Sequence, residues 1–308
     1  MNILLWHVHG SWTTSFVQGK HRYLVPVNND RDAWGRGRAR TFDWPETVEE
    51  LPLDEIRDID VAIAQRPEEL DLIPPHVPVI YVEHNTPKGD VPFSRHPLAD
   101  RDDVLIAHVT HFNELFWDCG ATRTTVIEHG IVEPKARWTG ELERLAIVTN
   151  EPVRRGRVTG TDLFPRFTGV APLDVFGMGA GGLTHERITA YEDPPQHEMH
   201  AEVARRRAYL HLCRWTSLGL SLIEAMQMGM PVIALATTEA VDAIPADAGI
   251  LATRVSTLVE AAQWLIDEPD EAARLGARAR QVALTRFGLD RFLADWDRLL
   301  EEETCASR

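Results

Sequence analysis

The sequence predicts an α/β protein made of two domains, each a doubly wound parallel sheet with helices on both faces. Short apolar runs alternate with helical patterns from one end of the 308-residue chain to the other, which is the pattern of repeated strand–helix units. Most of these runs are short and uniformly apolar, as in parallel strands that are buried on both faces. The chain is too long for one ordinary domain, so we expect two domains of roughly 150 residues each.

The apolar runs form two sets of predicted strands. The first set comprises Ile3–Val8, Tyr23–Val27, Val61–Ala64, Val79–Val82, Val104–Ala107 and Thr125–Ile127. The second set comprises Leu145–Thr149, Leu173–Phe176, Ala208–Leu212, Val232–Ala236 and Gly249–Ala252. Between the two sets, Glu133–Glu141 shows no periodicity, so we place the linker there.

The C-terminal part predicts three helices with amphipathic spacing. They span Ser256–Ile266, Asp270–Arg286 and Leu289–Glu303. Gly288 separates the last two, because glycine is a poor helix former.

Composition and charge limit the classes of function. The apolar content of 44% and charged content of 26% are those of a soluble globular protein. A net charge of −15 argues against binding of nucleic acid or anionic membrane across the general surface. Cys119, Cys213 and Cys305 are far apart and odd in number, so neither a disulfide framework nor a metal-binding spacing is indicated. The chain start lacks signal-peptide features and no apolar run reaches membrane-spanning length, so we expect a cytoplasmic protein.

The stretch from Thr216 to Ala234 predicts a glycine turn, a short helix and a buried strand. Gly219 permits the turn, Ser221 is a suitable helix cap, and Gly229 is a suitable helix end. A helix N-terminus attracts a diphosphate, and Glu224 in its first turn would accept hydrogen bonds from ribose hydroxyls. Ser221-x-x-Glu224 is equally a capping box, in which the glutamate binds only its own helix.

Loops that follow predicted strands are the next candidates, because parallel sheets bind ligands at the carboxyl ends of strands. After the first strand, Gly10 permits a tight turn and Ser11 can cap a helix, which suits an anion or a sugar. After the fourth, His84 could donate a hydrogen bond to a developing charge. The alternatives are strand-end packing for His7 and His9 and a purely structural role for His84.

In the second half, Arg154, Arg155 and Arg157 stand together in the loop after the strand Leu145–Thr149. Guanidinium groups match diphosphate oxygens well, although such a run is also compatible with a solvated surface. Gly177 follows another strand and would let the backbone pass near a nucleotide base, or belong to a flexible loop. No nucleophile triad, metal-ligand spacing or Walker loop occurs, so no metal site is expected.

Taken in order, these segments resemble the family-4 glycosyltransferases, which are retaining enzymes of the GT-B fold. The resemblance is carried by Gly219–Ala234, by Val126–Val132 and by the closing segment Arg286–Phe292. It implies two Rossmann-like domains that face a cleft, with a C-terminal helix crossing back to the N-terminal domain. The N-terminal domain would then be residues 1–134 completed by 289–308, and the nucleotide-sugar domain residues 141–288.

The resemblance also assigns roles to residues. Glu224 matches the second glutamate of the family's Glu-x7-Glu motif, which binds the donor ribose, and Arg154 matches the arginine that holds the donor diphosphate. His84 matches the histidine near the transferred sugar, and Gly10 lies in the loop that faces the donor phosphate and the acceptor. The other expected donor contacts are Ser11, Arg155, Arg157, Thr159, Gly177, Thr216, Gly219, Leu220, Ser221 and Leu222, and the expected acceptor contacts are His9, Trp12 and Asn85.

Two positions depart from the family pattern. Thr216 stands where the family has the first glutamate, and Thr159 stands where it has a phosphate-binding lysine. Thr216 can hydrogen-bond a sugar hydroxyl but supplies no charge, whereas Arg155 or Arg157 can replace the lysine. These departures favour an alternative in which the chain is a catalytically silent module that binds a nucleotide sugar or a partner protein.

The resulting prediction is a retaining, metal-independent, hexosyltransferase-like enzyme that moves a sugar from a nucleoside-diphosphate sugar to an acceptor, with no cofactor beyond that co-substrate. His84 and Arg154 are its expected catalytic residues. Another GT-B enzyme, such as an epimerase or a phosphorylase, is the nearest rival. Thr216 removes one carboxylate that an epimerase would use, and no lysine follows Lys135 to bind pyridoxal.

Overall fold

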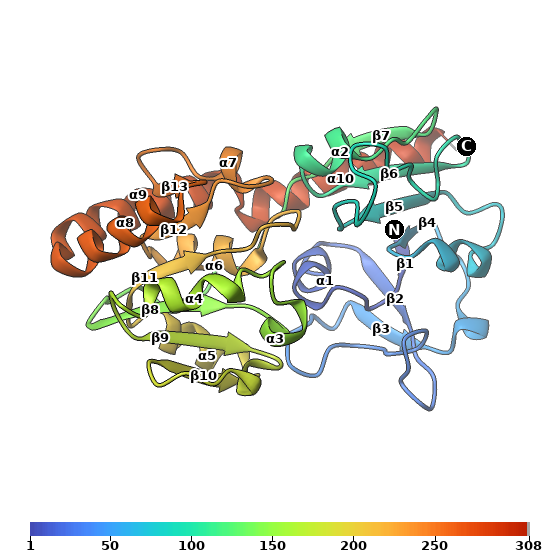
Figure 1. Cartoon of the computed structure of the whole chain (residues 1–308). Coiled ribbons are helices and arrows are strands. Elements are labelled where there is room, and N and C mark those ends of the chain that lie inside the picture. The colour runs from blue at the N-terminus through green and yellow to red at the C-terminus, as the bar shows by residue number, and fades with distance from the viewer. Residues whose placement is uncertain (307–308) are drawn as a thin grey trace. The chain divides into compact units, whose positions relative to one another are not determined.

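The computed structural model describes residues 1–306 and divides into two compact units. The N-terminal unit comprises Met1–Val132 together with the last helix, α10 (Leu289–Ala306), and the C-terminal unit comprises Glu133–Gly288. Each unit contains one sheet in which every strand pairing is parallel. The predicted α/β class with two doubly wound sheets is therefore confirmed (Figure 1).

The N-terminal unit is built on a seven-stranded sheet with the order β3-β2-β1-β4-β5-β6-β7. The order reverses between β1 and β4, which is the position where such sheets bind ligands at the carboxyl ends of their strands. The strands are β1 (Asn2–Leu5), β2 (Arg22–Pro26), β3 (Val48–Leu51), β4 (Val61–Ala64), β5 (Val79–Glu83), β6 (Val104–His108) and β7 (Arg123–Val126).

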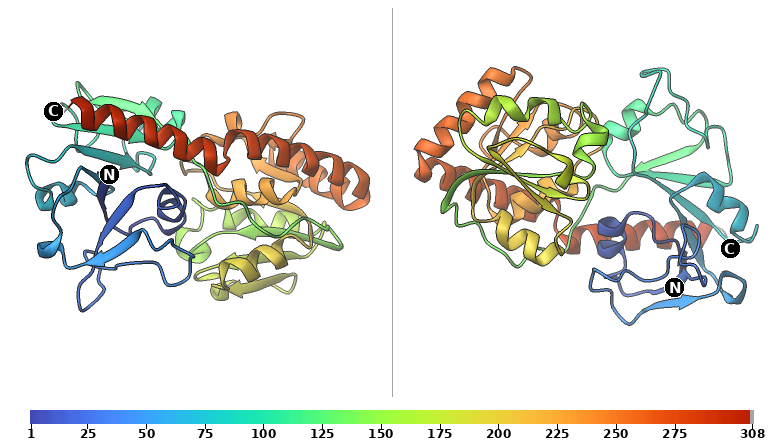
Figure 2. Two further views of the ribbon diagram at one scale, coloured as in Figure 1. Left: turned by 180° about the vertical axis from the view of Figure 1, so that it is seen from behind. Right: turned by 60° about the horizontal axis from the view of Figure 1, so that its bottom comes forward.

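Two helices cover one face of this sheet. Trp12 and Phe16 of α1 (Gly10–Phe16) pack with Phe292 and Trp296 of α10 in one core cluster, and Figure 2 shows α10 running along the sheet. The apolar positions of α10 recur every three or four residues, so one stripe of the helix is buried. The opposite face carries a second core cluster and the short helices η1 (Leu53–Glu55) and η2 (Pro67–Leu72). Helix α2 (His111–Phe116) precedes β7.

The C-terminal unit is built on a six-stranded sheet with the order β10-β9-β8-β11-β12-β13. Its strands are β8 (Leu142–Val148), β9 (Leu173–Gly177), β10 (Ile188–Glu192), β11 (Arg206–His211), β12 (Val232–Leu235) and β13 (Gly249–Ala252). Its longer helices are α5 (Gln196–Val203), α6 (Leu220–Met228), α8 (Val255–Asp267) and α9 (Pro269–Arg286). Its shorter ones are α3 (Pro152–Arg155), η3 (Thr161–Leu163), α4 (Phe164–Phe167), η4 (Ala180–Gly182) and α7 (Ala240–Ala243).

Helix α6 is held in place by close packing. Helix α9 crosses the end of α6 so tightly that a side chain at Gly276 would lie 2.0 Å from the carbonyl oxygen of Gly229. Gly229 itself has a φ of 89°, the left-handed conformation that commonly ends a helix. The predicted end of this helix is therefore confirmed.

An ion cluster joins three neighbouring strands near their amino ends. The carboxylate of Asp174 on β9 is fully buried and pairs with Arg206 of β11, whose Nε lies 2.7 Å from Asp174 Oδ2. Arg144 of β8 pairs with the same carboxylate, its Nε lying 2.8 Å from Oδ2. Arg206 is 2% exposed and also pairs with Glu202 of α5, with 2.6 Å between Nη1 and Oε2.

The structure differs from the expectations in two strands. Strands β3 and β10 were not predicted, and each forms an edge of its sheet. The segment Glu133–Glu141 packs on the C-terminal unit, because the backbone and indole N–H groups of Trp138 donate to the carbonyls of Met228 and Arg206, each at 2.9 Å. No helix within residues 1–306 is long and apolar enough to cross a membrane.

Candidate active site

The loop after β8 carries the three clustered arginines. It begins at Glu151, which has a φ of 55°, forms the single turn α3, and turns again at Gly160, which has a φ of 78°. A side chain at Gly160 would lie 2.0 Å from the carbonyl oxygen of Leu212, so the loop packs directly on the carboxyl end of β11. The arginine loop therefore lies at the edge of the sheet where parallel strands bind ligands.

The three arginines have different surroundings. Arg154 is 72% exposed and its Nε lies 3.4 Å from Glu151 Oε2, and Arg157 is 79% exposed and pairs with Asp162 at 3.5 Å. Arg155 is half-buried and has no ion pair or side-chain hydrogen bond among residues 1–306. Burial raises the pKa of the Cys213 thiol, and the nearby positive charge of Arg155 partly offsets that rise. Arg155 is thus the unpaired cation of this loop.

Two threonine hydroxyls brace the same loop. Thr159 Oγ1 donates to the carbonyl of Gly156 at 3.1 Å and lies 3.0 Å from Thr161 Oγ1, which donates to the carbonyl of Pro152 at 2.7 Å. Thr159 is buried, and its hydroxyl is used in hydrogen bonds within the loop. These bonds stabilise the conformation of the loop.

Helix α6 begins two positions earlier than expected. Gly219 is its N-cap residue with a φ of −70°, and the helix starts at Leu220, so the prediction that Ser221 caps it is wrong. The Ser221 hydroxyl instead accepts a hydrogen bond from Tyr209 at 2.9 Å. Gly219 is needed because a side chain there would lie 2.7 Å from the ring of His211, and not because the backbone turns sharply. The amides of Leu220 and Ser221 have no acceptor within the described chain, so they are available to an anion.

Glu224 lies one turn into α6, not in its first turn, and the expected capping box does not form. The Glu224 carboxylate is 6% exposed and faces α5. Its Oε1 accepts a hydrogen bond from Gln196 Nε2 at 3.0 Å, and its Oε2 lies 3.1 Å from His200 Nε2, off the line of a hydrogen bond. Glu224 is therefore oriented by α5 and keeps unused lone pairs.

Three further donor positions have different neighbours. Thr216 is half-buried in the segment before α6, and Leu222 is completely buried. Gly177 ends β9 with a φ of 135°, and a side chain there would lie 2.4 Å from the carbonyl oxygen of Thr149. Glu192 accepts the N–H groups of Gly179 and Gly181 at 2.7 Å each, which lowers the pKa of its carboxyl. The glycine loop after β9 is thus tied to β10.

In the N-terminal unit, three histidines follow the carboxyl ends of β1, β5 and β7. The ring centroids of His9 and His84 are 4.0 Å apart, and those of Trp12 and His84 are 5.1 Å apart with the two rings nearly perpendicular. Burial, with the nearby His9 and His129, holds the pKa of His84 well below its ordinary value. Burial, with His9 and Arg291, lowers the pKa of His129 to about 3. His84 and His129 are therefore neutral near pH 7.

Gln65 fixes the tautomer of His84. The Gln65 amide donates from Nε2 to the carbonyl of Trp6 at 2.9 Å, so its Oε1 is an acceptor for His84 Nε2 at 3.0 Å. The proton of the neutral ring therefore lies on Nε2, and Nδ1 offers a lone pair. His84 can therefore accept a hydrogen bond at Nδ1, whereas the sequence predicted a donor.

The remaining predicted site residues of this unit follow β1 and β5. Gly10 and Ser11 form the start of α1, and a side chain at Gly10 would lie 3.1 Å from the ring of Phe42. Trp12 is 1% exposed and belongs to the core. Asn85 is exposed, and its carbonyl accepts from Trp117 Nε1 at 2.8 Å.

Four residues of these sites were not assigned a role from the sequence. They are Gln65, His129, Gln196 and His200. His129 lies in the strand–turn segment after β7, so its position in the sequence could have marked it as a site residue. The other three act through partners distant in the chain, and no local pattern marks them.

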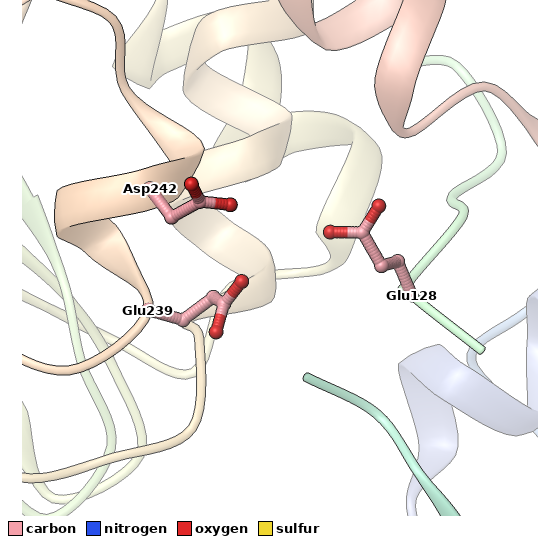
Figure 3. Close-up of side chains that lie close together, drawn as sticks. All are labelled: Glu128, Glu239 and Asp242. Atoms are coloured by element: carbon pink, nitrogen blue, oxygen red, sulfur yellow. The ribbon is translucent and has the colours of Figure 1, made fainter. Parts of the chain in front are cut away.

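Figure 3 draws a group of acidic side chains of the kind that can bind a metal ion. Glu239 and Asp242 adjoin α7 in the C-terminal unit, and Glu128, also drawn in Figure 3, belongs to the N-terminal unit. Arg286 Nη2 lies 2.6 Å from Asp242 Oδ2 and 3.4 Å from Glu239 Oε1. This cation already compensates the two carboxylates of the C-terminal unit, so we assign them no metal.

Four buried histidines predict a loss of stability in mild acid. Burial lowers the pKa of His108 and of His211 to about 4, and His84 and His129 are lowered as described. Below pH 6.5 and above the lowered pKa values of these histidines, the unfolded chain binds protons that the folded chain does not. The free energy of unfolding therefore falls as the pH falls. We expect each histidine to cost about 1 kcal/mol per pH unit below 6.5, measured as the urea midpoint between pH 7.5 and 5.

The matched variant is His108→Leu, which removes one titrating ring whose Nδ1 has no partner within residues 1–306. It should make the urea midpoint less dependent on pH. A midpoint that stays constant from pH 7.5 to 5 in the unmodified protein would contradict the burial argument.

Comparison with known proteins connects the C-terminal unit to one family. Residues 183–282 match the family model of glycosyl transferases group 1. This segment includes α5, α6 and the Glu224 carboxylate. A search of curated proteins finds no match.

Solved structures share the fold along nearly the whole chain. Sucrose-phosphate synthase from Thermosynechococcus elongatus matches with a TM-score of 0.75 at 13% identity, covering 99% of this chain and 100% of that one. HepE (Alr3699) of Anabaena, solved with UDP-glucose, matches with a TM-score of 0.72 at 14% identity, covering 98% and 100%. A glycosyltransferase from Rickettsia africae matches with a TM-score of 0.68 at 10% identity, covering 98% of each chain. The fold is therefore the GT-B fold, and the family-model match supports a glycosyltransferase.

Proposed function

We propose that the protein is a glycosyltransferase that takes its sugar from a nucleoside-diphosphate sugar, retains the anomeric configuration and uses no metal ion. The family-model match and the GT-B fold support the transferase class. HepE, which shares the fold, binds UDP-glucose, so a UDP-hexose is the first donor to test. Retention rests on the resemblance of residues 219–234 to family-4 enzymes.

The observation that carries this proposal is the pairing of an anion site with a buried carboxylate in the C-terminal unit. Arg155, without a carboxylate partner in the described structure, lies in the loop after β8, and the free amides of Leu220 and Ser221 begin α6. Both features lie at the carboxyl edge of one sheet. Positive charge fixed in this way stabilises the diphosphate as it departs, and it fills the role that a divalent cation has in other transferases.

Glu224 is proposed to bind the ribose of the donor. The hydrogen bond from Gln196 holds its carboxylate in place beside the His200 ring, and its remaining lone pairs suit the two ribose hydroxyls. The Thr216 hydroxyl would donate or accept a hydrogen bond with the transferred sugar, but it would supply no charge. In the N-terminal unit, neutral His84 would accept a hydrogen bond from a sugar hydroxyl through Nδ1.

The test compares UDP with UDP that lacks both ribose hydroxyls. By calorimetry, the unmodified protein should bind UDP at least about tenfold more tightly, since hydrogen bonds to a charged group contribute about 1.5–3 kcal/mol each. Glu224→Ala should bind the two nucleotides equally. Gln196→Ala keeps the carboxylate and should keep most of the discrimination. Equal binding of both nucleotides by the unmodified protein would contradict the ribose assignment.

Transfer itself is tested by incubating UDP-glucose with a panel of sugar acceptors and determining the product anomer by NMR. An α-linked product from the α-linked donor supports retention, and a β-linked product overturns it. Chelation with EDTA should leave the rate unchanged. Tight UDP binding without transfer or donor hydrolysis would instead identify a silent nucleotide-sugar-binding module.

A further inference from the structure

A pocket of about 700 Å³ lies in the N-terminal unit, outside the residues discussed so far. Its walls come from residues 26–35 after β2, residues 52–54 after β3, and η2, which follows β4. All three segments begin at carboxyl ends of parallel strands, so the pocket opens at the ligand-binding edge of the sheet. Its volume suits a ligand of one or two sugar rings.

One wall of the pocket is an ordered aromatic ring. Trp34 is 40% exposed, and the Arg66 guanidinium stacks 4.1 Å from its ring centroid. Asp32 ties the Trp34 loop, because its Oδ1 accepts from the N–H of Trp34 at 2.8 Å and of Gly35 at 3.1 Å. Leu53 and Leu72 add apolar surface. This wall offers a flat face for the C–H side of a sugar ring.

The polar side chains that line the pocket are acidic or neutral. Asp54, Glu68 and Asp71 contribute three carboxylates, and no lysine or arginine lines the pocket. None of the three makes a hydrogen bond or an ion pair with any of residues 1–306. The neighbouring cations are already paired: Arg66, which stacks on Trp34, pairs with Glu69, and Arg101 pairs with Asp103. A concave surface whose charges are all negative concentrates cations. The pocket therefore attracts cations and repels phosphates and carboxylates.

We propose that this pocket binds an amine-bearing sugar, which serves as the glycosyl acceptor of the proposed reaction. Trp34 would stack on the sugar ring, while the carboxylates of Asp54, Glu68 and Asp71 accept hydrogen bonds from the ammonium group and the hydroxyls. The assignment of this sugar as the acceptor rests on the proposed transferase function. The binding step does not, because every pocket residue belongs to the N-terminal unit and acts without the donor.

The test uses two probes that share one disaccharide backbone and differ in charge, in the absence of nucleotide. The disaccharide of β-1,4-linked glucosamine carries two amines, and its N-acetylated form carries none. By calorimetry or ligand-observed NMR at low salt, the full chain should bind the amine form at least about tenfold more tightly, and this preference should fall as salt is added. Equal binding of the two probes, or binding of neither, would overturn the proposal.

Variants test whether the residues of this pocket cause the preference for the amine form. We expect the preference for the amine form to be lost in the triple variant Asp54→Asn, Glu68→Gln and Asp71→Asn. The variant Trp34→Ala should bind both probes more weakly. Asp102→Asn, a change at an exposed carboxylate outside the pocket, should leave the preference intact. A preference that survives the triple change would place the site elsewhere and reject this pocket.

The acceptor role has its own readout. With UDP-glucose present, the amine disaccharide should be glycosylated at least about tenfold faster than the acetylated one, and the triple variant should lose this difference while binding UDP normally. Amine binding without UDP binding would reject the transferase and keep the pocket. UDP binding without amine binding would reject the pocket and keep the donor site.

Discussion

Replacing Arg155 with alanine is expected to reduce the rate of sugar transfer by about 10²–10³-fold, the loss found when one preorganised charge-stabilising donor is removed. Arg155 has no carboxylate partner among residues 1–306 and is half-buried at the carboxyl edge of the sheet. Its full charge is therefore available to the departing diphosphate. The measurement is the initial rate of transfer from UDP-glucose at saturating donor, together with the Kd for UDP.

The neighbouring arginines provide matched controls. Arg157 is exposed and paired with Asp162, so Arg157→Ala should change the rate less than about threefold, as exposed ion pairs contribute little. Arg154 is expected to have an intermediate effect, because its pairing with Glu151 is long and solvent-exposed. A larger loss for Arg154→Ala than for Arg155→Ala would return the diphosphate role to Arg154, as the family resemblance assigned it. Full activity in both variants would reject the arginine loop as the phosphate site.

The central strands of both sheets could be predicted because burial on two faces requires an apolar run. The central strand Val61–Ala64 was predicted with its observed bounds. The edge strand Gly249–Ala252 was also predicted with its observed bounds, because its sequence, Gly-Ile-Leu-Ala, is an apolar run. The two unpredicted strands, β3 and β10, are edge strands that pair on one side only. Their sequences, Val-Glu-Glu-Leu and Ile-Thr-Ala-Tyr-Glu, keep polar residues that face water, so they lack the run that marks a buried strand. The polar residues in β3 and β10, which an edge strand tolerates, are why these two strands were missed, whereas the edge strands β7 and β13 were predicted.

The candidate site was predictable in location and not in its contacts. Polar residues and glycines after strands marked the loops, because parallel topology brings those ends to one edge. The partners of Glu224 could not be predicted, since Gln196 and His200 reach it from α5, 28 residues away in the case of Gln196. The tautomer of His84 depends in the same way on Gln65, which is 19 residues distant. Local patterns locate a site, whereas long-range hydrogen bonds determine what each side chain can do there.

Replacing Asp174 with alanine is expected to lower the free energy of unfolding of the C-terminal unit by about 3–5 kcal/mol, the usual effect of removing one partner from a buried ion pair. The Asp174 carboxylate is fully buried and compensates Arg206 and Arg144 together. Arg206 is 2% exposed and would keep only Glu202 as a charged partner. Its remaining charge would be poorly solvated in the folded state and well solvated in the unfolded state.

Hydrogen exchange of peptides from β9 and β11, with urea unfolding, measures the Asp174→Ala effect in the unit concerned. The control is Asp174→Leu combined with Arg206→Met, which removes a buried charge of each sign and should recover at least about half of the lost stability. The cluster lies near the amino ends of the strands, opposite the edge that carries Arg155. The folded variants should therefore bind UDP with unchanged affinity. A stable Asp174→Ala protein would show that water reaches Arg206 through the sheet, and a loss of UDP affinity would show that the cluster also shapes the donor site.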